Sequence, residues 1–204
     1  AGHGEVKLRI TAQGKDIKEA KALIKPIEEK LIQRTGYKFY GYEEDSLASI
    51  IIKMLKDKGE TICTAESCTA GGLGASLGSI PGASQVFKGG IIAYSNSVKE
   101  NLLSVPSKIL IKHGAVSHQV VSQMAKGAKE LLHTDWSIAI SGIAGPTGGT
   151  ESKPIGTVLI ALANSKECLS FEENFKSYQT RDLIQELSVL RALDQLRLIL
   201  HDRR

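Results

Sequence analysis

The chain has 204 residues, of which 42% are hydrophobic and 24% are charged. This is the composition of a globular protein with room for one medium domain, or for a small module beside a larger one. The formal charge of +4 is too small to favour nucleic acid binding, which usually needs a concentrated basic face. No apolar run approaches the roughly 20 residues of a membrane helix, and no signal segment is recognisable.

Cysteine usage indicates a reducing, cytoplasmic setting. The three cysteines, Cys63, Cys68 and Cys168, are odd in number and have no C-x-x-C spacing. With no signal segment, a disulfide framework is not expected. The five histidines form no recognisable ligand set. We therefore expect no structural metal and no cofactor.

Residues 5–46 are predicted to form a small module. Alternating and helical hydrophobic patterns predict a strand, a helix and a second strand at residues 5–11, 15–34 and 38–42. Pro26 lies inside the helical pattern and predicts a kink or a break there. Gly36 follows as a helix stop. Such a β-α-β unit is too small to be comfortable alone.

Residues 47–204 are predicted to form the larger domain, in which strands and helices alternate. The predicted helices cover residues 46–58, 68–78, 98–103, 117–132 and 180–200. The predicted strands cover residues 61–65, 90–95, 136–140, 156–163 and 167–175. The alternation predicts an α/β fold with three α/β/α layers, and the terminal hairpin predicts a mixed sheet.

The first candidate for chemistry is the strand-to-helix turn TAESCTAGG, residues 64–72. A helix start offers unpaired N–H groups and a positive dipole end, and Gly71 and Gly72 let a ligand approach. Ser67 could there attack a carbonyl while these N–H groups hold the oxyanion. The alternative is that Ser67 merely caps the helix. Cys68 is a rival nucleophile, although a buried inert thiol is favoured.

The second candidate follows the apolar strand at residues 90–93, where ligands usually bind in α/β sheets. Lys99, if desolvated, could lose its proton and act as a base for a serine. Tyr94 could relay a proton or donate to an oxyanion. The alternative is a solvated lysine and a packed tyrosine.

The third candidate is the stretch SGIAGPTGGT, residues 141–150, which has four glycines in ten residues. It follows a buried strand, and its backbone could wrap a phosphate or a ribose. It has neither the Walker order nor the dinucleotide G-x-G-x-x-G order. A plain flexible turn is the alternative.

In this order and spacing the motifs resemble the C-terminal, nicotinamide-nucleotide amidohydrolase domain of the CinA family. The matching stretches include TAESCTAGGLGASLGSIPGAS, FKGGIIAYSNSVKENLLSV, HGAVS and SGIAGPTGGTESKPIGTV. Residues 5–58 resemble the KH-like module that precedes this domain. The family's leading molybdopterin-binding-like domain has no counterpart in the sequence, so we expect a longer parent protein and do not assign that domain's activity here.

The resemblance implies hydrolysis of nicotinamide mononucleotide to nicotinate mononucleotide and ammonia, without a metal. It makes Ser67 the nucleophile, Lys99 the general base and Tyr94 a further residue of the catalytic site. Its implied substrate-binding residues are Gly71, Gly72, Ser141, Gly142, Gly145 and Arg181, with Arg181 on the phosphate.

Two departures and several alternatives stay open. The family usually has Gly-Asp-Arg where this chain has Gln179-Thr180-Arg181, and the KH-like module lacks a Gly-x-x-Gly loop, so RNA binding in that mode is not expected. The domain could act on a different small amide, or be a non-catalytic nucleotide-binding or interaction module. A nucleic-acid role linked to competence is a weaker idea. A symmetric homodimer is the expected assembly.

Overall fold

The computed structural model describes residues 4–202. The chain divides into two compact units, and the boundary along the chain lies between Ser46 and Leu47. Each unit is described by itself.

The first unit is built around one helix, α1 (Ile17–Thr35). Asp16 caps it by accepting the Glu19 N–H at 2.8 Å. Gly36 ends it with a φ of 53°, and a short 3-10 helix, η1 (Gly36–Lys38), follows. The helix continues through Pro26, so the predicted break is wrong. A proline removes one helical hydrogen bond, and the remaining bonds of a long helix can bridge that loss.

The two strands predicted in this unit, at residues 5–11 and 38–42, are also wrong. Apart from a single bridge at Glu5, the described residues of both segments form no strand. A strand exists only through bonds to a neighbour and apolar packing on one face. No residue of α1 is buried, so the helix supplies no core on which such a pair could form.

The second unit contains a five-stranded sheet in the order β2-β1-β3-β4-β5. Its strands are β1 (Ile62–Glu66), β2 (Phe87–Ile92), β3 (Trp136–Gly142), β4 (Thr157–Ala163) and β5 (Cys168–Asn174). β1 runs parallel to both β2 and β3, while β4 runs antiparallel to β3 and to β5. The sheet is therefore mixed, as the hairpin predicted.

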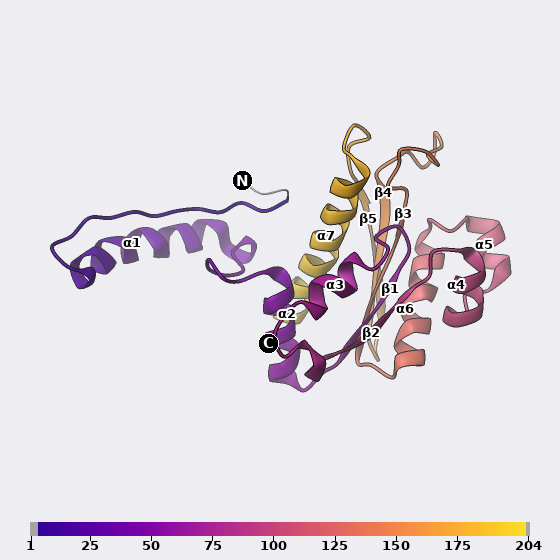
Figure 1. Cartoon of the computed structure of the whole chain (residues 1–204), viewed down its shortest axis with the longest axis horizontal. Helices are drawn as coiled ribbons and strands as arrows, with labels where there is room; N and C mark the ends of the chain where they lie inside the picture. Colours follow the sequence, from indigo (N-terminus) through magenta and orange to yellow (C-terminus); the bar gives the residue numbers. More distant parts are fainter. Residues whose placement is uncertain (1–3, 203–204) are drawn as a thin grey trace. The chain divides into compact units, whose positions relative to one another are not determined.

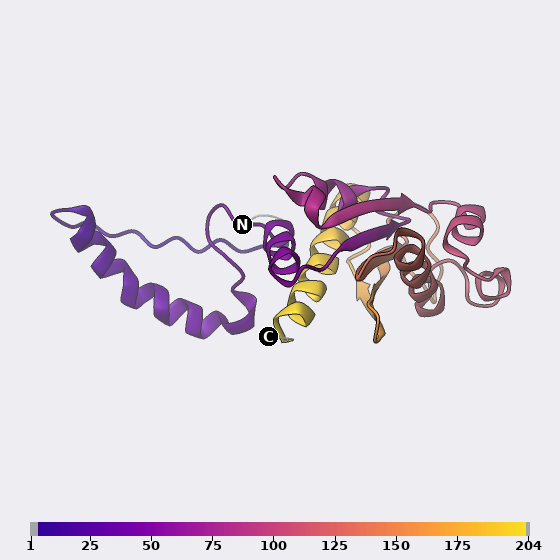
Figure 2. The same cartoon turned by 90° about the horizontal axis from the view of Figure 1, so that it is seen from below.

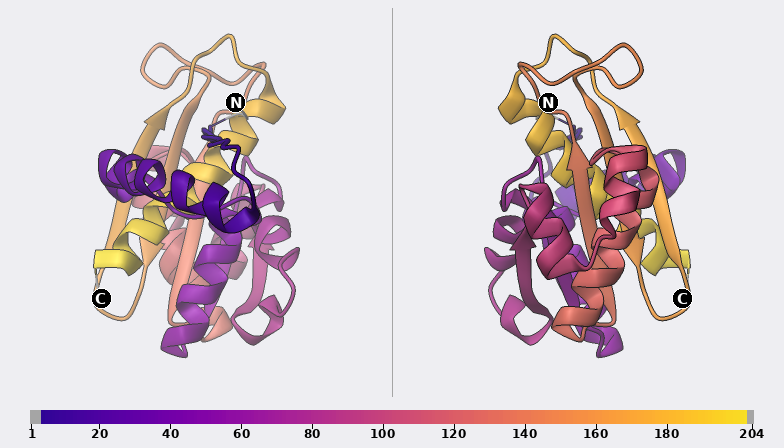
Figure 3. Two further views of the ribbon diagram at one scale, coloured as in Figure 1. Left: turned by 90° about the vertical axis from the view of Figure 1, so that its left-hand side faces the viewer. Right: turned by 90° about the vertical axis from the view of Figure 1, so that its right-hand side faces the viewer.

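Helices cover both faces of this sheet, so the predicted three layers are present (Figure 1). They are α2 (Leu47–Lys58), α3 (Gly72–Gly78), α4 (Asn96–Leu103), α5 (Ser107–His113), α6 (His118–Leu132) and α7 (Arg181–Asp202). On one face α6 crosses all five strands, with α4 and α5 outside it; α3 and α7 lie on the other face with α2 (Figures 2 and 3).

Three details differ from the sequence pattern. The helix expected at 68–78 begins only at Gly72, because residues 67–71 form a turn. The strand expected at 90–95 is β2, which ends at Ile92 because Ser95 instead caps α4. α5 was not predicted. A short 3-10 helix, η2 (Ala83–Gln85), precedes β2.

The α6 layer packs so closely on the end of α4 that a glycine is needed at the contact. A Cβ on Gly127 of α6 would lie 2.0 Å from the Leu103 carbonyl oxygen. In α3, a Cβ on Gly78 would meet nothing nearer than Phe87 Cε1 at 4.0 Å. The two helical glycines are thus a matched pair, one crowded and one open.

We expect Gly127→Ala to lower the free energy of unfolding by about 1–3 kcal/mol, because α6 must move away from Leu103. Gly78→Ala is the control and should leave stability unchanged or slightly raised. Urea unfolding followed by circular dichroism measures both. Equal stability of the two variants would contradict the close packing of α6 on α4.

Candidate active site

Ser67 follows directly after β1, the strand flanked by two parallel neighbours. Its N–H donates to the Ile140 carbonyl of β3 at 2.9 Å, and the Ala93 N–H donates to the Glu66 carbonyl at 2.7 Å. The carboxyl ends of β1, β2 and β3 therefore meet around Ser67. This edge of an α/β sheet is where ligands usually bind.

The Lys99 side chain comes from α4 to the same place. Its Nζ lies 3.2 Å from Ser67 Oγ, and it donates to the carbonyl oxygens of Ala93 at 2.7 Å and Tyr94 at 3.1 Å. Lys99 is only 1% exposed. Ser95 orients α4 by accepting the Val98 N–H at 3.3 Å. The strand end and the helix cap together aim the amine at Ser67.

The surroundings of Lys99 suit a neutral amine. Burial lowers the pKa of Lys99 below its ordinary 10.5, and the opposing electrostatic effect of Cys68 is smaller. Across residues 4–202 no carboxylate forms an ion pair with it. The two carbonyls can only accept, so they take both N–H groups of a neutral amine. In that neutral form the lone pair could accept the Ser67 hydroxyl proton, the arrangement of a nucleophile and its base. In the ammonium form all three N–H groups would donate, one of them to Ser67 Oγ.

Cys68 is poorly suited to be the nucleophile. It is 5% exposed, and burial raises its pKa to about 12, so its thiol stays protonated near neutral pH. Its carbonyl accepts a hydrogen bond from Gln185 Nε2 of α7 at 2.6 Å. Gln185 thus holds the turn after Ser67, a role that the sequence pattern of α7 did not indicate.

The first N–H groups of α3 are already used inside the protein. The Gly71 N–H donates to Glu66 Oε2 at 3.1 Å, and the Gly72 N–H donates to the Thr69 carbonyl at 3.0 Å. For either of these two N–H groups to bind an oxyanion, its present hydrogen bond would have to break. Among the described residues, the N–H groups of Cys68 and Thr69 have no oxygen acceptor. The Cys68 N–H also contacts its own sulfur, so these two groups, next to Ser67, are the N–H groups of the turn that no protein oxygen occupies.

Tyr94 and Arg181 lie together, at the start of α7. Arg181 Nη2 donates to the Tyr94 hydroxyl at 2.9 Å, and Nη1 donates to the Gly145 carbonyl at 2.7 Å. Tyr94 is 57% exposed, and no contact from its hydroxyl to Ser67 or Lys99 is present among the described residues. A guanidinium has five N–H donors, so Arg181 keeps donors for a ligand.

Ser141 and Gly142 end β3, beside Ser67 in the sheet. The Ser141 hydroxyl is buried and donates to the Ala115 carbonyl at 2.9 Å. A Cβ on Gly142 would lie 2.8 Å from Val158 Cγ2, so this position needs a glycine. Both residues serve packing here, and substrate contact through the Ser141 hydroxyl would require that bond to break.

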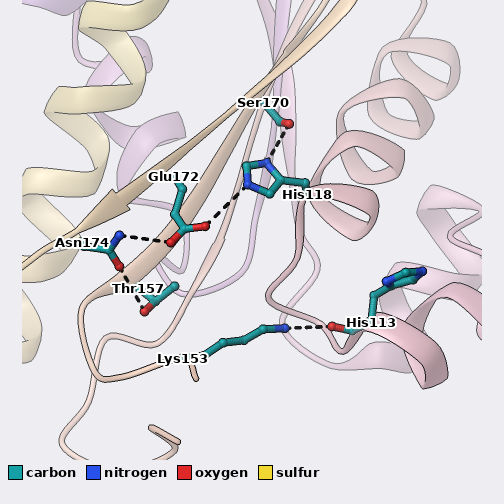
Figure 4. Close-up of polar contacts among 7 residues, drawn as sticks. All are labelled: His113, His118, Lys153, Thr157, Ser170, Glu172 and Asn174. Atoms are coloured by element: carbon teal, nitrogen blue, oxygen red, sulfur yellow. Dashed lines mark hydrogen bonds and ion pairs between the residues drawn. The ribbon is translucent and has the colours of Figure 1, made fainter. Parts of the chain in front are cut away.

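Two surface hollows lie near this end of the sheet, and neither is lined by Ser67 or Lys99. An open one of about 430 Å³ lies along residues 146–155 of the glycine-rich loop. The other, of about 250 Å³, has His113, His118, Lys153 and Glu172 in its lining, and Figure 4 draws the polar contacts around them. In it His118 Nδ1 lies 2.8 Å from Ser170 Oγ, His118 Nε2 lies 3.5 Å from Glu172, and Lys153 Nζ donates to the His113 carbonyl at 2.8 Å.

Within residues 4–202, no group of three or more His, Cys, Asp and Glu side chains is placed to hold a metal ion. No helix of the described chain is both long and apolar enough to cross a membrane.

Glu66 was missed by the sequence reasoning, which placed it in the turn without a role. It is 2% exposed and accepts from the Leu73 N–H at 3.0 Å and the Gly74 N–H at 2.8 Å. A carboxylate directly before a glycine-rich helix start was the available signal, since anions are stabilised at helix N-termini.

Replacing Lys99 with methionine should reveal the lowered pKa of Lys99 through the pH dependence of the free energy of unfolding. As pH falls from 10.5 towards the folded-state pKa, the unfolded chain gains a proton that folded Lys99 does not, so the wild type loses stability relative to Lys99→Met. The difference should grow by about 1.4 kcal/mol per pH unit within that window and level off below it.

Urea unfolding at pH 7 to 10 measures this difference. Lys108→Met, at an exposed position of α5, is the control and should show no such slope. A Lys99→Met difference that is constant over this range would mean that the folded and unfolded pKa values are equal.

Comparison with known proteins identifies the family to which the chain is similar. The family model of the CinA C-terminal domain matches residues 44–200, and that of the damage-inducible protein CinA KH domain matches residues 1–64. A CinA-like protein of Prochlorococcus marinus is 56% identical over 200 residues, and one of Parasynechococcus marenigrum is 52% identical over 197. These cover 98% and 97% of this chain but 47% of each relative. The chain thus spans about half the length of the curated relatives it matches.

Solved structures agree. The competence/damage inducible protein CihA from Agrobacterium tumefaciens is 36% identical with a TM-score of 0.73, covering 76% of this chain and 93% of that one. The competence damage-inducible protein A from Klebsiella pneumoniae is 31% identical with a TM-score of 0.74, covering 78% and 97%. By these matches to family models, relatives and solved structures, the chain belongs to the CinA family.

Proposed function

We propose that the second unit is an amidohydrolase that converts nicotinamide mononucleotide and water to nicotinate mononucleotide and ammonia. The observation that carries the proposal is the partly buried contact of 3.2 Å between Lys99 Nζ and Ser67 Oγ. The two carbonyl acceptors of Lys99 leave its lone pair to the serine. The identity of the substrate is inferred from the resemblance of the motifs to the family's amidohydrolase domain.

In the first half of the reaction, neutral Lys99 accepts the Ser67 proton as Oγ attacks the carboxamide carbon. The carbonyl oxygen becomes negative and takes hydrogen bonds from the N–H groups of Cys68 and Thr69. One of these is the N–H directly after the nucleophile, a common source of oxyanion stabilisation. The C–N bond then breaks, and ammonia leaves with the proton that Lys99 carried.

In the second half, water attacks the ester carbon of the acyl-enzyme while Lys99 accepts one of its protons. The bond to Ser67 Oγ breaks, Ser67 regains the proton from Lys99, and the carboxylic acid leaves and then ionises in water. The sum is one amide and one water giving one carboxylic acid and one ammonia. Lys99 returns to its neutral form, so no further reactant is needed.

Arg181 and the glycine-rich loop are assigned to the phosphate and ribose. Arg181 already bridges Tyr94 and Gly145 and has donors to spare. A guanidinium suits a phosphate because it can donate two parallel hydrogen bonds. In this assignment Tyr94 orients Arg181, in place of the predicted proton relay.

The catalytic roles of Ser67 and Lys99 are tested by measuring ammonia release from nicotinamide mononucleotide. Ser67→Ala and Lys99→Arg should each lower kcat by about 10³-fold or more, because an arginine cannot lose its proton near neutral pH. Wild-type kcat/KM should fall as pH drops through the Lys99 pKa, which lies below 10.5.

Lys108→Ala, on an exposed face, should behave as wild type in the same assay. Wild-type turnover in Ser67→Ala would refute the nucleophile assignment. Turnover of another small amide alone would move the proposal to a different substrate. Saturable nucleotide binding without turnover would favour the non-catalytic alternative.

The Arg181 assignment is tested by comparing two substrates. Arg181→Gln should raise KM for nicotinamide mononucleotide by about 10- to 100-fold, the value of a charge-assisted hydrogen bond. KM for nicotinamide riboside, which has no phosphate, should change little. Tyr94→Phe removes one partner of Arg181 and keeps the charge, so it should raise the same KM by less than Arg181→Gln does. An equal rise for both substrates would contradict a phosphate contact.

A further inference from the structure

The turn that carries Ser67 has an unusual backbone. Ala70 has a φ of 51° and Gly71 has a φ of 101°, so two consecutive residues adopt the left-handed region. A residue with a side chain is seldom found there, and this conformation costs about 1–2 kcal/mol at Ala70. Such a conformation persists only where surrounding contacts hold it in place.

Glu66 supplies those contacts. Its carboxylate accepts from the Thr69 hydroxyl at 2.7 Å and from the N–H groups of Gly71, Leu73 and Gly74 at 3.1, 3.0 and 2.8 Å. The side chain is 2% exposed, and no Lys or Arg forms an ion pair with it across residues 4–202. Its negative charge is therefore held by the turn and by the positive end of α3.

Because Glu66 lies at the end of β1, its side-chain bonds fix the turn relative to the sheet. Its backbone is fixed in β1, where it pairs with Ile92 and Ile140. Its side chain reaches forward over residues 67–71 to the start of α3. The turn is thus held at both of its ends. Within residues 67–71, the N–H groups of Cys68 and Thr69 are the two that lack an oxygen acceptor among the described residues.

We propose that Glu66 is the positioning residue of the active site. Its carboxylate holds the strained turn so that Ser67 Oγ faces Lys99 and the Cys68 and Thr69 N–H groups point to the oxyanion. This role rests on the proposed amidohydrolase function for its chemistry, while the backbone restraint can be measured separately. Glu66 touches neither the substrate nor Lys99 in this role.

The ionised carboxylate is required because every group that faces it is a donor. Glutamine would present an NH₂ group to one or more of those N–H groups, and a buried donor would lose its acceptor. The turn would relax, and Ser67 would move relative to Lys99. A displacement of about 1 Å at a reacting group can cost about 100-fold in rate.

The test compares Glu66→Gln with Glu60→Gln. Glu60, two residues before β1, is a half-buried carboxylate that accepts a hydrogen bond from Trp136 Nε1 at 2.7 Å. Thr69→Val, which removes only the hydroxyl donor to Glu66, is a milder second variant in case Glu66→Gln does not fold. Folding is checked by urea unfolding.

Three readouts are made on each protein: kcat and KM for nicotinamide mononucleotide, the rate of Ser67 labelling by a fluorophosphonate, and backbone amide NMR shifts. We expect Glu66→Gln to lower kcat and the labelling rate by about 10- to 100-fold with KM within about 3-fold. Thr69→Val should lower both by about 3- to 10-fold. Amide shifts should change at residues 67–74, and Glu60→Gln should match the wild type.

The outcomes separate the two proposals. A wild type that is labelled at Ser67 but releases no ammonia refutes the substrate, and the labelling rates still decide the role of Glu66. If the wild type is not labelled either, the amide shifts decide it. A folded Glu66→Gln protein with wild-type labelling, or with unchanged amide shifts at residues 67–70, overturns the proposal.

Discussion

The buried amine of Lys99 is the constraint on which the proposed chemistry depends. A lysine with 1% exposure and no carboxylate partner across residues 4–202 is unfavourable as an ammonium. The fold accommodates it because the strand end at Ala93 and Tyr94 offers two carbonyls. Those carbonyls are free because β2 ends at Ile92, where the chain turns into α4. Desolvation and geometry thus act on the same group.

The other half of the site is a backbone feature rather than a side chain. Ser67 sits between a central strand and a short helix, and the turn between them is strained at Ala70 and Gly71. The Glu66 carboxylate takes up the helix-start N–H groups that would otherwise attract an anion. This shifts the free donors back to Cys68 and Thr69, beside the nucleophile. The glycines are needed for the shape of the turn, and in the proposed mechanism the neighbouring N–H groups stabilise the oxyanion.

The α/β fold was accessible from the sequence because buried strands and amphipathic helices have distinct hydrophobic periods. Membership of the CinA family was accessible through the resemblance of the motifs, such as TAESCTAGG and SGIAGPTGGT. The first unit was predicted less well. The strand patterns at residues 5–11 and 38–42 are local, whereas a strand needs partners that are distant in the chain. α1, with no buried residue, offers no core for them. Local propensity there was not supported by tertiary contacts.

The sequence by itself determined the types of group in the site: a serine after a strand, a lysine after the neighbouring strand, a glycine-rich loop and an arginine at a helix start. Only the tertiary structure decided which of them meet. It brought Lys99 to Ser67, tied Arg181 to Tyr94 and Gly145, turned the Ser141 hydroxyl towards Ala115, and gave Glu66 its partners. The physical reason is that strand order and register join residues far apart in the chain, whereas sequence periodicity reports only which face of an element is apolar.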